Sequence, residues 1–161
     1  MLSSLNSNEK VAFFLGIGEL TLKNMTENEY LIKVREALDL CWDWYETKKP
    51  TGDEIYSYLD DGTEFGGLFI YMQMDQEKAN EKIWDVLVDA ITYINREAYE
   101  FNNEKHVPSP IENVDDDLVD HFIDSANMVS SDYGLQMKRL VHFLAGKDIS
   151  ERSCILRFLG L

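Results

Sequence analysis

Residues 76–102 read QEKANEKIWDVLVDAITYINREAYEFN, and this stretch decides the fold. Its apolar residues recur every three to four positions, which is the spacing of an α-helix. They cover more than half of the helical circumference and leave a narrow polar line. Such a helix needs neighbours on two sides, so we expect a long central helix, capped by Asp75, inside a bundle. The apolar positions are Trp84, Leu87, Val88, Ile91, Ile94, Ala98 and Phe101.

The segments on either side also have helical periodicity. Thr-Glu-Asn-Glu at 26–29 and Thr-Gly-Asp-Glu at 51–54 have the pattern of a capping box, in which each end side chain bonds the backbone amide of the other. Ser150 is expected to cap the last helix. The expected helices cover about 7–24, 27–47, 51–60, 115–129, 133–144 and 150–159.

Residues 65–74 leave a choice between a strand and a helix. Leu68, Phe69 and Ile70 are typical of a buried strand, but no second convincing strand exists to pair with them. We therefore favour a short helix after Thr63. Residues 104–114 are expected to form a loop. The sequence predicts an all-α, single-domain bundle of six to eight helices around a long central helix, with residues 1–161 as one domain.

The expected cellular compartment follows from two features that the sequence lacks. No segment approaches the ~20 apolar residues that cross a bilayer, and the N-terminus has neither the basic region nor the apolar stretch of a signal peptide. We therefore expect a cytoplasmic protein. Cys41 and Cys154 lie far apart among apolar residues, which favours two buried thiols over a disulfide.

The net charge of −15 comes from the middle of the chain. Residues 51–130 hold 19 acidic against 4 basic residues, whereas the flanks hold 11 of each. This balance argues against nucleic-acid binding, which needs clustered Lys and Arg, and against anionic membranes. Because like charges held close together repel, we interpret the segregation as a surface that meets a positively charged partner.

Two acidic segments are the candidates for that surface. The first surrounds the expected short helix at 51–60, and the second begins the helix at 115–129. The candidate partner-binding residues are Asp53, Glu54, Asp60, Asp61 and Glu64 in the first segment, and Asp115, Asp116, Asp117, Asp120 and Asp124 in the second.

Metal binding is the competing interpretation of the same carboxylates. Asp116, Asp120 and Asp124 share one helix face near His121, but di-metal helical bundles use Glu-x-x-His units that this chain lacks. The first segment does not match the spacing of a calcium loop. We expect no metal and no cofactor. Since no motif joins a nucleophile to a base, we also expect no catalytic residues.

Trp42 and Trp44 point about 200° apart on a helix, because successive residues turn by about 100°. One should therefore be in the core. The other either packs inside as well or forms a partly exposed anchor of the kind that dominates interfaces.

Several segments resemble a known family. EALDLCWDW at 36–44 and TGDEIYSYLD at 51–60 are similar to the sixth immunity-protein family of bacterial polymorphic toxin systems. So are VDAITYI at 88–94 with Ala98-Tyr99, and VPSPIENVD at 107–115. The likeness runs over roughly residues 10–125 in the same order and spacing.

The resemblance implies a mostly helical, cytoplasmic protein that binds a toxin and blocks it. Together with the charge, it predicts a basic toxin, such as a nuclease, that is occluded by the acidic surface. The choice of acidic residues rests on charge alone. A non-catalytic helical adaptor and a carboxylate-rich metalloenzyme remain the alternatives.

Overall fold

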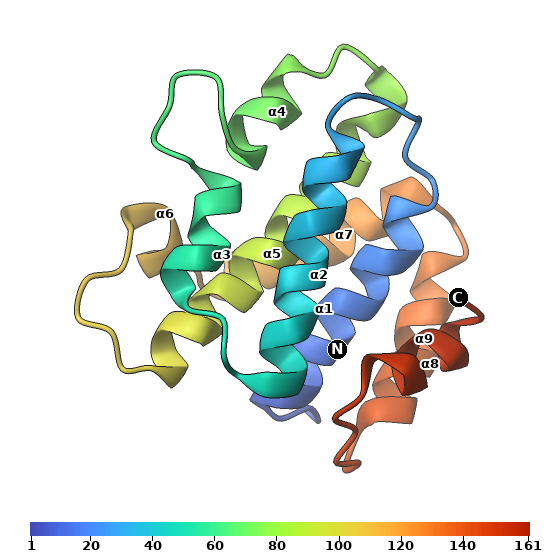
Figure 1. Ribbon diagram of the computed structural model, residues 1–161. Helices are drawn as coiled ribbons and strands as arrows, with labels where there is room; N and C mark the ends of the chain where they lie inside the picture. Colours follow the sequence, from blue (N-terminus) through green and yellow to red (C-terminus); the bar gives the residue numbers. More distant parts are fainter.

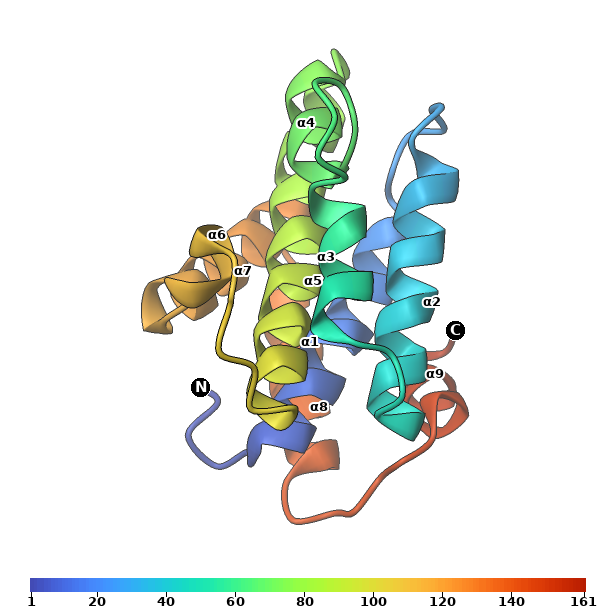
Figure 2. The same ribbon diagram turned by 60° about the vertical axis from the view of Figure 1, so that its left-hand side comes forward.

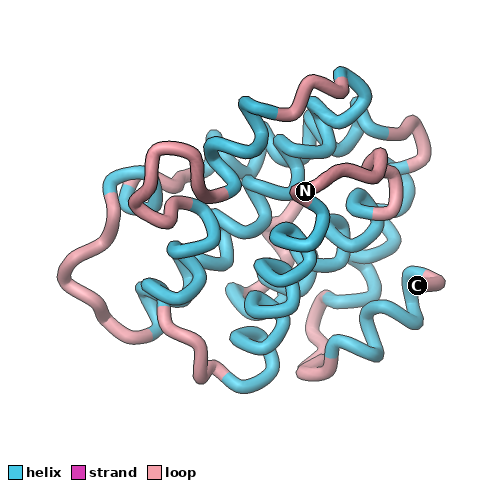
Figure 3. Tube along the Cα trace, turned by 45° about the horizontal axis from the view of Figure 1, so that its top comes forward, coloured by secondary structure: helices cyan, strands magenta, loops and turns pink.

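The computed structural model describes residues 1–161, and every regular element in it is a helix (Figures 1 and 3). The all-α prediction is therefore confirmed, and the structure has nine α-helices where six to eight were expected. The helices are α1 (Ser7–Leu22), α2 (Leu31–Thr47), α3 (Gly52–Leu59), α4 (Leu68–Met74), α5 (Glu81–Phe101), α6 (Ser109–Glu112), α7 (Asp116–Val129), α8 (Tyr133–Leu144) and α9 (Arg152–Leu159), with one 3₁₀ turn at Lys78–Asn80.

The short helix α6 lies inside the segment that was expected to be a loop. It is a single turn that follows Pro108 and carries Pro110 near its start. Proline suits the first turn of a helix because the amide it lacks has no partner there. The two prolines that suggested a loop therefore begin a helical turn instead.

The long helix α5 occupies the middle of the bundle, as predicted (Figures 1 and 2). It packs against α1, α2, α3, α4, α6 and α7. It differs from the expectation in one respect, because Phe101 at its C-terminal end is 59 % exposed. The other apolar positions named for this helix are buried.

The start of α5 was predicted wrongly. The helix begins at Glu81, and Asp75 ends α4 rather than capping α5. The Asp75 carboxylate accepts hydrogen bonds from Asn80 Nδ2 at 2.9 Å and Trp84 Nε1 at 2.8 Å. Burial tends to raise the pKa of Asp75, but these bonds outweigh it and lower that pKa. The carboxylate thus holds residues 75–80 in a turn before the helix.

Local capping patterns were reliable only in part. The capping box of Thr51 and Glu54 is present, with bonds of 2.7 and 3.1 Å. The box predicted at Thr26 is absent, because α2 begins at Leu31 and the Thr26 amide donates to the Asn80 side chain at 3.0 Å. Ser150 does not cap α9 either, since the N-cap residue is Glu151.

A single cluster of 37 buried apolar residues forms the core, and every helix contributes to it. Trp42 and Trp44 are 1 % and 3 % exposed, so both pack inside and the exposed-anchor alternative is wrong. Cys41 and Cys154 are free thiols, but only Cys41 is buried, because Cys154 is partly exposed. Burial raises the pKa of the Cys41 thiol.

The C-terminal helices α8 and α9 pack against α1. They approach so closely at Gly16 that a Cβ there would lie 3.0 Å from Leu140 and 3.1 Å from Leu159. The buried Glu19 carboxylate of α1 adds an ion pair at 3.1 Å to Arg152, which begins α9. Residues 130–161 are thereby part of the same core. No helix combines the length and the apolar character needed to cross a bilayer.

Candidate partner-binding surface

All ten candidate carboxylates belong to exposed residues, and none of them forms an ion pair. Within residues 51–130, the acidic residues that do form ion pairs are Asp85, Asp89 and Glu100. Most of the negative charge of this segment is therefore free to act on an approaching partner.

The first five candidates, Asp53, Glu54, Asp60, Asp61 and Glu64, form what we call the α3 group. Several of them also have local structural bonds. Asp53 accepts a hydrogen bond of 2.6 Å from the Tyr99 hydroxyl. Asp60 and Asp61 accept backbone amides in the turn after α3, and the bonds from the Thr63 hydroxyl and amide lower the pKa of Asp61. The group is charged, but part of its hydrogen-bonding capacity is already used.

The other five, Asp115, Asp116, Asp117, Asp120 and Asp124, form what we call the α7 group. Asp115 caps α7 by accepting the Asp117 amide at 3.0 Å. Negative charge in a first helical turn is stabilised by the positive end of the helix dipole. On the same helix, His121 Nδ1 lies 2.6 Å from the Asp89 carboxylate and ties α7 to α5. The bundle therefore holds these carboxylates on a fixed helix.

The structure does not bring the two groups together. Helices α3 and α7 both pack against α5. In Figure 1, α3 lies in front of α5 and α7 lies behind it, and Figure 2 shows them on opposite sides of α5. The ten residues predicted from charge alone thus form two separate patches.

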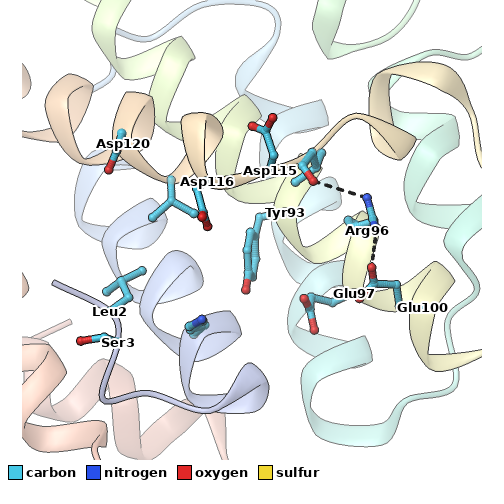
Figure 4. A pocket seen from close by; sticks show the side chains of 12 residues that line it. Leu2, Ser3, Tyr93, Arg96, Glu97, Glu100, Asp115, Asp116 and Asp120 are labelled. Carbon is cyan, nitrogen blue, oxygen red and sulfur yellow. Dashed lines mark hydrogen bonds and ion pairs between the residues drawn. The ribbon is translucent and has the colours of Figure 1, made fainter.

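Three residues of the α7 group line a hollow of about 490 Å³, which we call the acidic hollow (Figure 4). Here Asp115, Asp116 and Asp120 face Glu97 and Glu100 of α5. Lys10 and Arg96 are the two basic residues in the lining, so negative charge predominates. The remaining lining residues are Leu2, Ser3, Tyr93, Val114 and Val119.

Tyr93 stands at the centre of the acidic hollow, between the α7 carboxylates and the pair Glu97 and Glu100 (Figure 4). Its ring is stacked on the buried Phe14 ring, with centroids 4.1 Å apart. Burial raises the pKa of the Tyr93 hydroxyl, and the nearby charge of Glu97 adds to that rise. The aromatic floor of the hollow is therefore a continuation of the core.

Arg96 holds the wall of the acidic hollow in place. Its guanidinium pairs with Glu100 at 2.5 Å and donates to the Glu112 carbonyl at 2.8 Å, at the end of α6. This residue therefore positions the segment that leads into α7. Arg96 offsets the charge of Glu100, so the carboxylates of the acidic hollow without an ion pair are those of Glu97, Asp115, Asp116 and Asp120.

Glu97 differs from the other carboxylates that line the acidic hollow, which all belong to exposed residues. It is half-buried and forms no ion pair. Burial raises its pKa, and the charge of Glu100 adds to the rise. Glu97 and Tyr93 were not predicted from the sequence as residues of a binding surface. The available signal was their spacing of four on one helix face, but only packing places that face beside α7.

The metal interpretation has no structural support in these residues. No group of three or more His, Cys, Asp or Glu side chains is arranged to hold a metal ion. His121 turns toward Asp89 and Asp85 of α5, at 2.6 and 3.9 Å. It is therefore used in helix packing rather than grouped with Asp116, Asp120 and Asp124.

Comparisons with known proteins identify the family. Neither the curated proteins nor the solved structures gave a match. The family model described as Immunity protein Imm6 matches residues 9–129. That span runs through α1 to α7 and includes ten of the twelve residues that line the acidic hollow. Because the match covers most of the chain, this protein belongs to the Imm6 immunity protein family.

Proposed function

We propose that this protein neutralises a cognate bacterial polymorphic toxin by binding it, and that the toxin is basic, as a nuclease would be. The binding is steric and electrostatic and involves no catalytic step. Residues 1–161 act as one domain, and the encounter takes place in the cytoplasm. Family membership supports the neutralising role, and charge supports the nature of the partner.

One observation carries the electrostatic part of the proposal. The ten candidate carboxylates are exposed, and none is neutralised by an ion pair within the chain. A helical adaptor that used acidity only for solubility would have no need to keep one segment at −15. A toxin with a positively charged face supplies the missing counter-charge.

The acidic hollow is the part of this surface best suited to anchor the toxin. A lysine or arginine side chain of the toxin would enter it and lie between Glu97 on one side and Asp116 and Asp120 on the other. Its aliphatic stem would rest on Tyr93 and Val119, as long basic side chains do on apolar surfaces. Charge assistance strengthens such hydrogen bonds relative to neutral ones.

A toxin domain encoded by a neighbouring gene would supply the test. Co-expression with that domain should restore growth of a host that the domain alone kills. In a surface-binding assay, the association rate should fall about 10- to 100-fold between low and high salt, because complementary charge mainly accelerates encounter.

Two results would count against the proposal in different ways. Binding with a salt-independent association rate would leave neutralisation intact but remove electrostatic recognition. Failure to bind or to protect against any neighbouring toxin domain would remove the immunity role itself.

A further inference from the structure

A second hollow, of about 480 Å³, has the opposite charge. It lies on α8, α9 and the residues between them, at the end of the chain coloured orange to red in Figure 1. We call it the basic hollow. Its lining residues are Lys138, Arg139, His142, Phe143, Lys147 and Phe158, so no carboxylate lines it in a chain with 30 acidic residues.

The cations of the basic hollow have no counter-charge in the protein. Lys138, Arg139 and Lys147 are exposed, and none of them forms an ion pair. By contrast, Arg35 and Arg152 are both paired with the buried Glu19. Three of the ten Lys and Arg residues that form no ion pair therefore line this one hollow.

An aromatic pair fixes the geometry of these cations. The rings of Phe143 and Phe158 are stacked, with centroids 4.0 Å apart and planes within 9°. Lys147 Nζ lies 4.7 Å from the Phe143 centroid, and Arg139 Cζ lies 5.9 Å from that of Phe158. Such cation–π contacts hold the basic groups beside an apolar surface before any ligand arrives.

The basic hollow also lies outside the family match. That match ends at residue 129, whereas the lining begins at Lys138. The hollow is therefore a separate feature from the acidic surface to which the toxin was assigned.

We propose that the basic hollow binds a short acidic polypeptide segment of a partner protein. Carboxylates of the segment pair with Lys138, Arg139 and Lys147, and an apolar side chain beside them packs against the edges of Phe143 and Phe158. Charge complementarity selects the acidic residues, and the aromatic pair selects their apolar neighbour.

The same observations disfavour other anionic occupants. Nucleic acid binds such sites by stacking bases on aromatic faces, but these ring faces are covered by each other and by the two cations. A second copy of this chain brings a further −15 of charge, and repulsion grows with the charge of the ligand. A short segment with few carboxylates avoids both difficulties.

The test uses the full chain and two labelled peptides of about eight residues, which alternate Glu or Gln with Leu. Fluorescence anisotropy should show binding of the Glu-Leu peptide and much weaker binding of the Gln-Leu peptide. The double variant Lys138→Glu, Lys147→Glu should raise the Kd about tenfold, because it replaces two attractive charges with two repulsive ones. The double variant Lys23→Glu, Lys49→Glu changes two exposed, unpaired lysines elsewhere and should bind like the parent.

Several outcomes would overturn the proposal. Equal Kd values for the two double variants, or equal binding of the two peptides, would show that the basic residues do not select acidic segments. Displacement of the Glu-Leu peptide by inorganic phosphate at the same concentration would show that any anion suffices. Tighter binding of a single-stranded oligonucleotide would assign the hollow to nucleic acid. Sedimentation that shows a dimer lost in the Lys138, Lys147 variant would assign the hollow to a second copy instead. If that variant does not fold, Lys138→Gln with Lys147→Gln replaces it, and unchanged binding in the replacement also overturns the proposal.

Discussion

Asp89 connects the central helix to the helix that carries half of the candidate surface. Its carboxylate lies 2.6 Å from His121 Nδ1 and is 14 % exposed. Burial raises the pKa of Asp89 to about 6, and the nearby charge of Asp85 adds to the rise, while His121 and Lys82 oppose it. The charged form of this carboxyl is therefore less favoured in the folded protein than in the unfolded chain.

The raised pKa gives a prediction for stability against pH. An unfolded Asp titrates near pH 3.9, so the stabilisation from native protonation of Asp89 is fully present below that pH. It is lost as the pH rises through about 6. Asp89→Asn should therefore stabilise the fold at pH 7 by about 1–2 kcal/mol, since one pKa unit corresponds to about 1.4 kcal/mol and part of the gain is lost with the His121 pair. Urea unfolding at several pH values measures this difference.

The control for this residue is Asp124→Asn, which removes an exposed charge from α7. The difference in unfolding free energy between Asp89→Asn and the parent should shrink as the pH falls from 7 to 4, and the control difference should stay near zero. If the difference in unfolding free energy between Asp89→Asn and the parent does not change with pH, the raised pKa of Asp89 is contradicted.

At the scale of elements, α5 separates two acidic patches that charge counting treats as one. The α3 group and the acidic hollow can therefore be changed independently. Asp116→Asn, Asp120→Asn, Glu97→Gln removes three charges from the hollow and leaves the Asp115 cap intact. Asp60→Asn, Asp61→Asn, Glu64→Gln removes three charges from the α3 group, and Asn can still accept the amides of that turn.

If the acidic hollow anchors the toxin, the first triple variant should raise the Kd at least tenfold, or about 1.4 kcal/mol. The second triple variant should slow association only slightly, because rim charges act mainly on encounter. Surface plasmon resonance with the purified toxin domain gives both quantities. A larger rise in Kd for the second triple variant than for the first would show that the α3 group is the anchor. Unchanged Kd values in both variants would show that the acidic surface does not take part in recognition.

At the scale of the whole molecule, α8 and α9 complete the core although they lie beyond the family match. They bury Tyr133, Met137, Leu140, Leu144 and Ile155. Burial of a large apolar side chain contributes about 1.5–3 kcal/mol, so these residues together contribute about 10 kcal/mol. That is comparable with the total stability of a domain.

A chain that ends after Ser130 should therefore lose cooperative thermal unfolding, as followed by circular dichroism. Its α1 face around Gly16 would be uncovered, because Leu140, Ile155 and Leu159 pack there. A chain shortened only by Gly160 and Leu161 should unfold like the parent. Cooperative unfolding of the chain that ends at Ser130 would show that residues 9–129 fold without the C-terminal helices.

Some predictions depended only on residues that are near one another in the sequence. The spacing of apolar residues over 81–101 indicated a long helix with neighbours on several sides, and the capping box at 51–54 placed the start of α3. The family resemblance over roughly residues 10–125 was confirmed by the match to residues 9–129. Helical periodicity and capping are local properties, so the sequence expresses them directly.

Other features depended on residues far apart in the chain. Asn80 takes the Thr26 amide and displaces the expected cap, and α5 keeps Asp61 away from Asp116. Packing alone sets Glu97 beside Asp116 and Asp120, and it gathers Arg139, Lys147 and Phe158 into a hollow of the opposite sign. The sequence by itself thus determined most of the helices, the family and the amount of charge. Only the tertiary structure decided which charges share a surface, because that depends on how helices distant in sequence pack around α5.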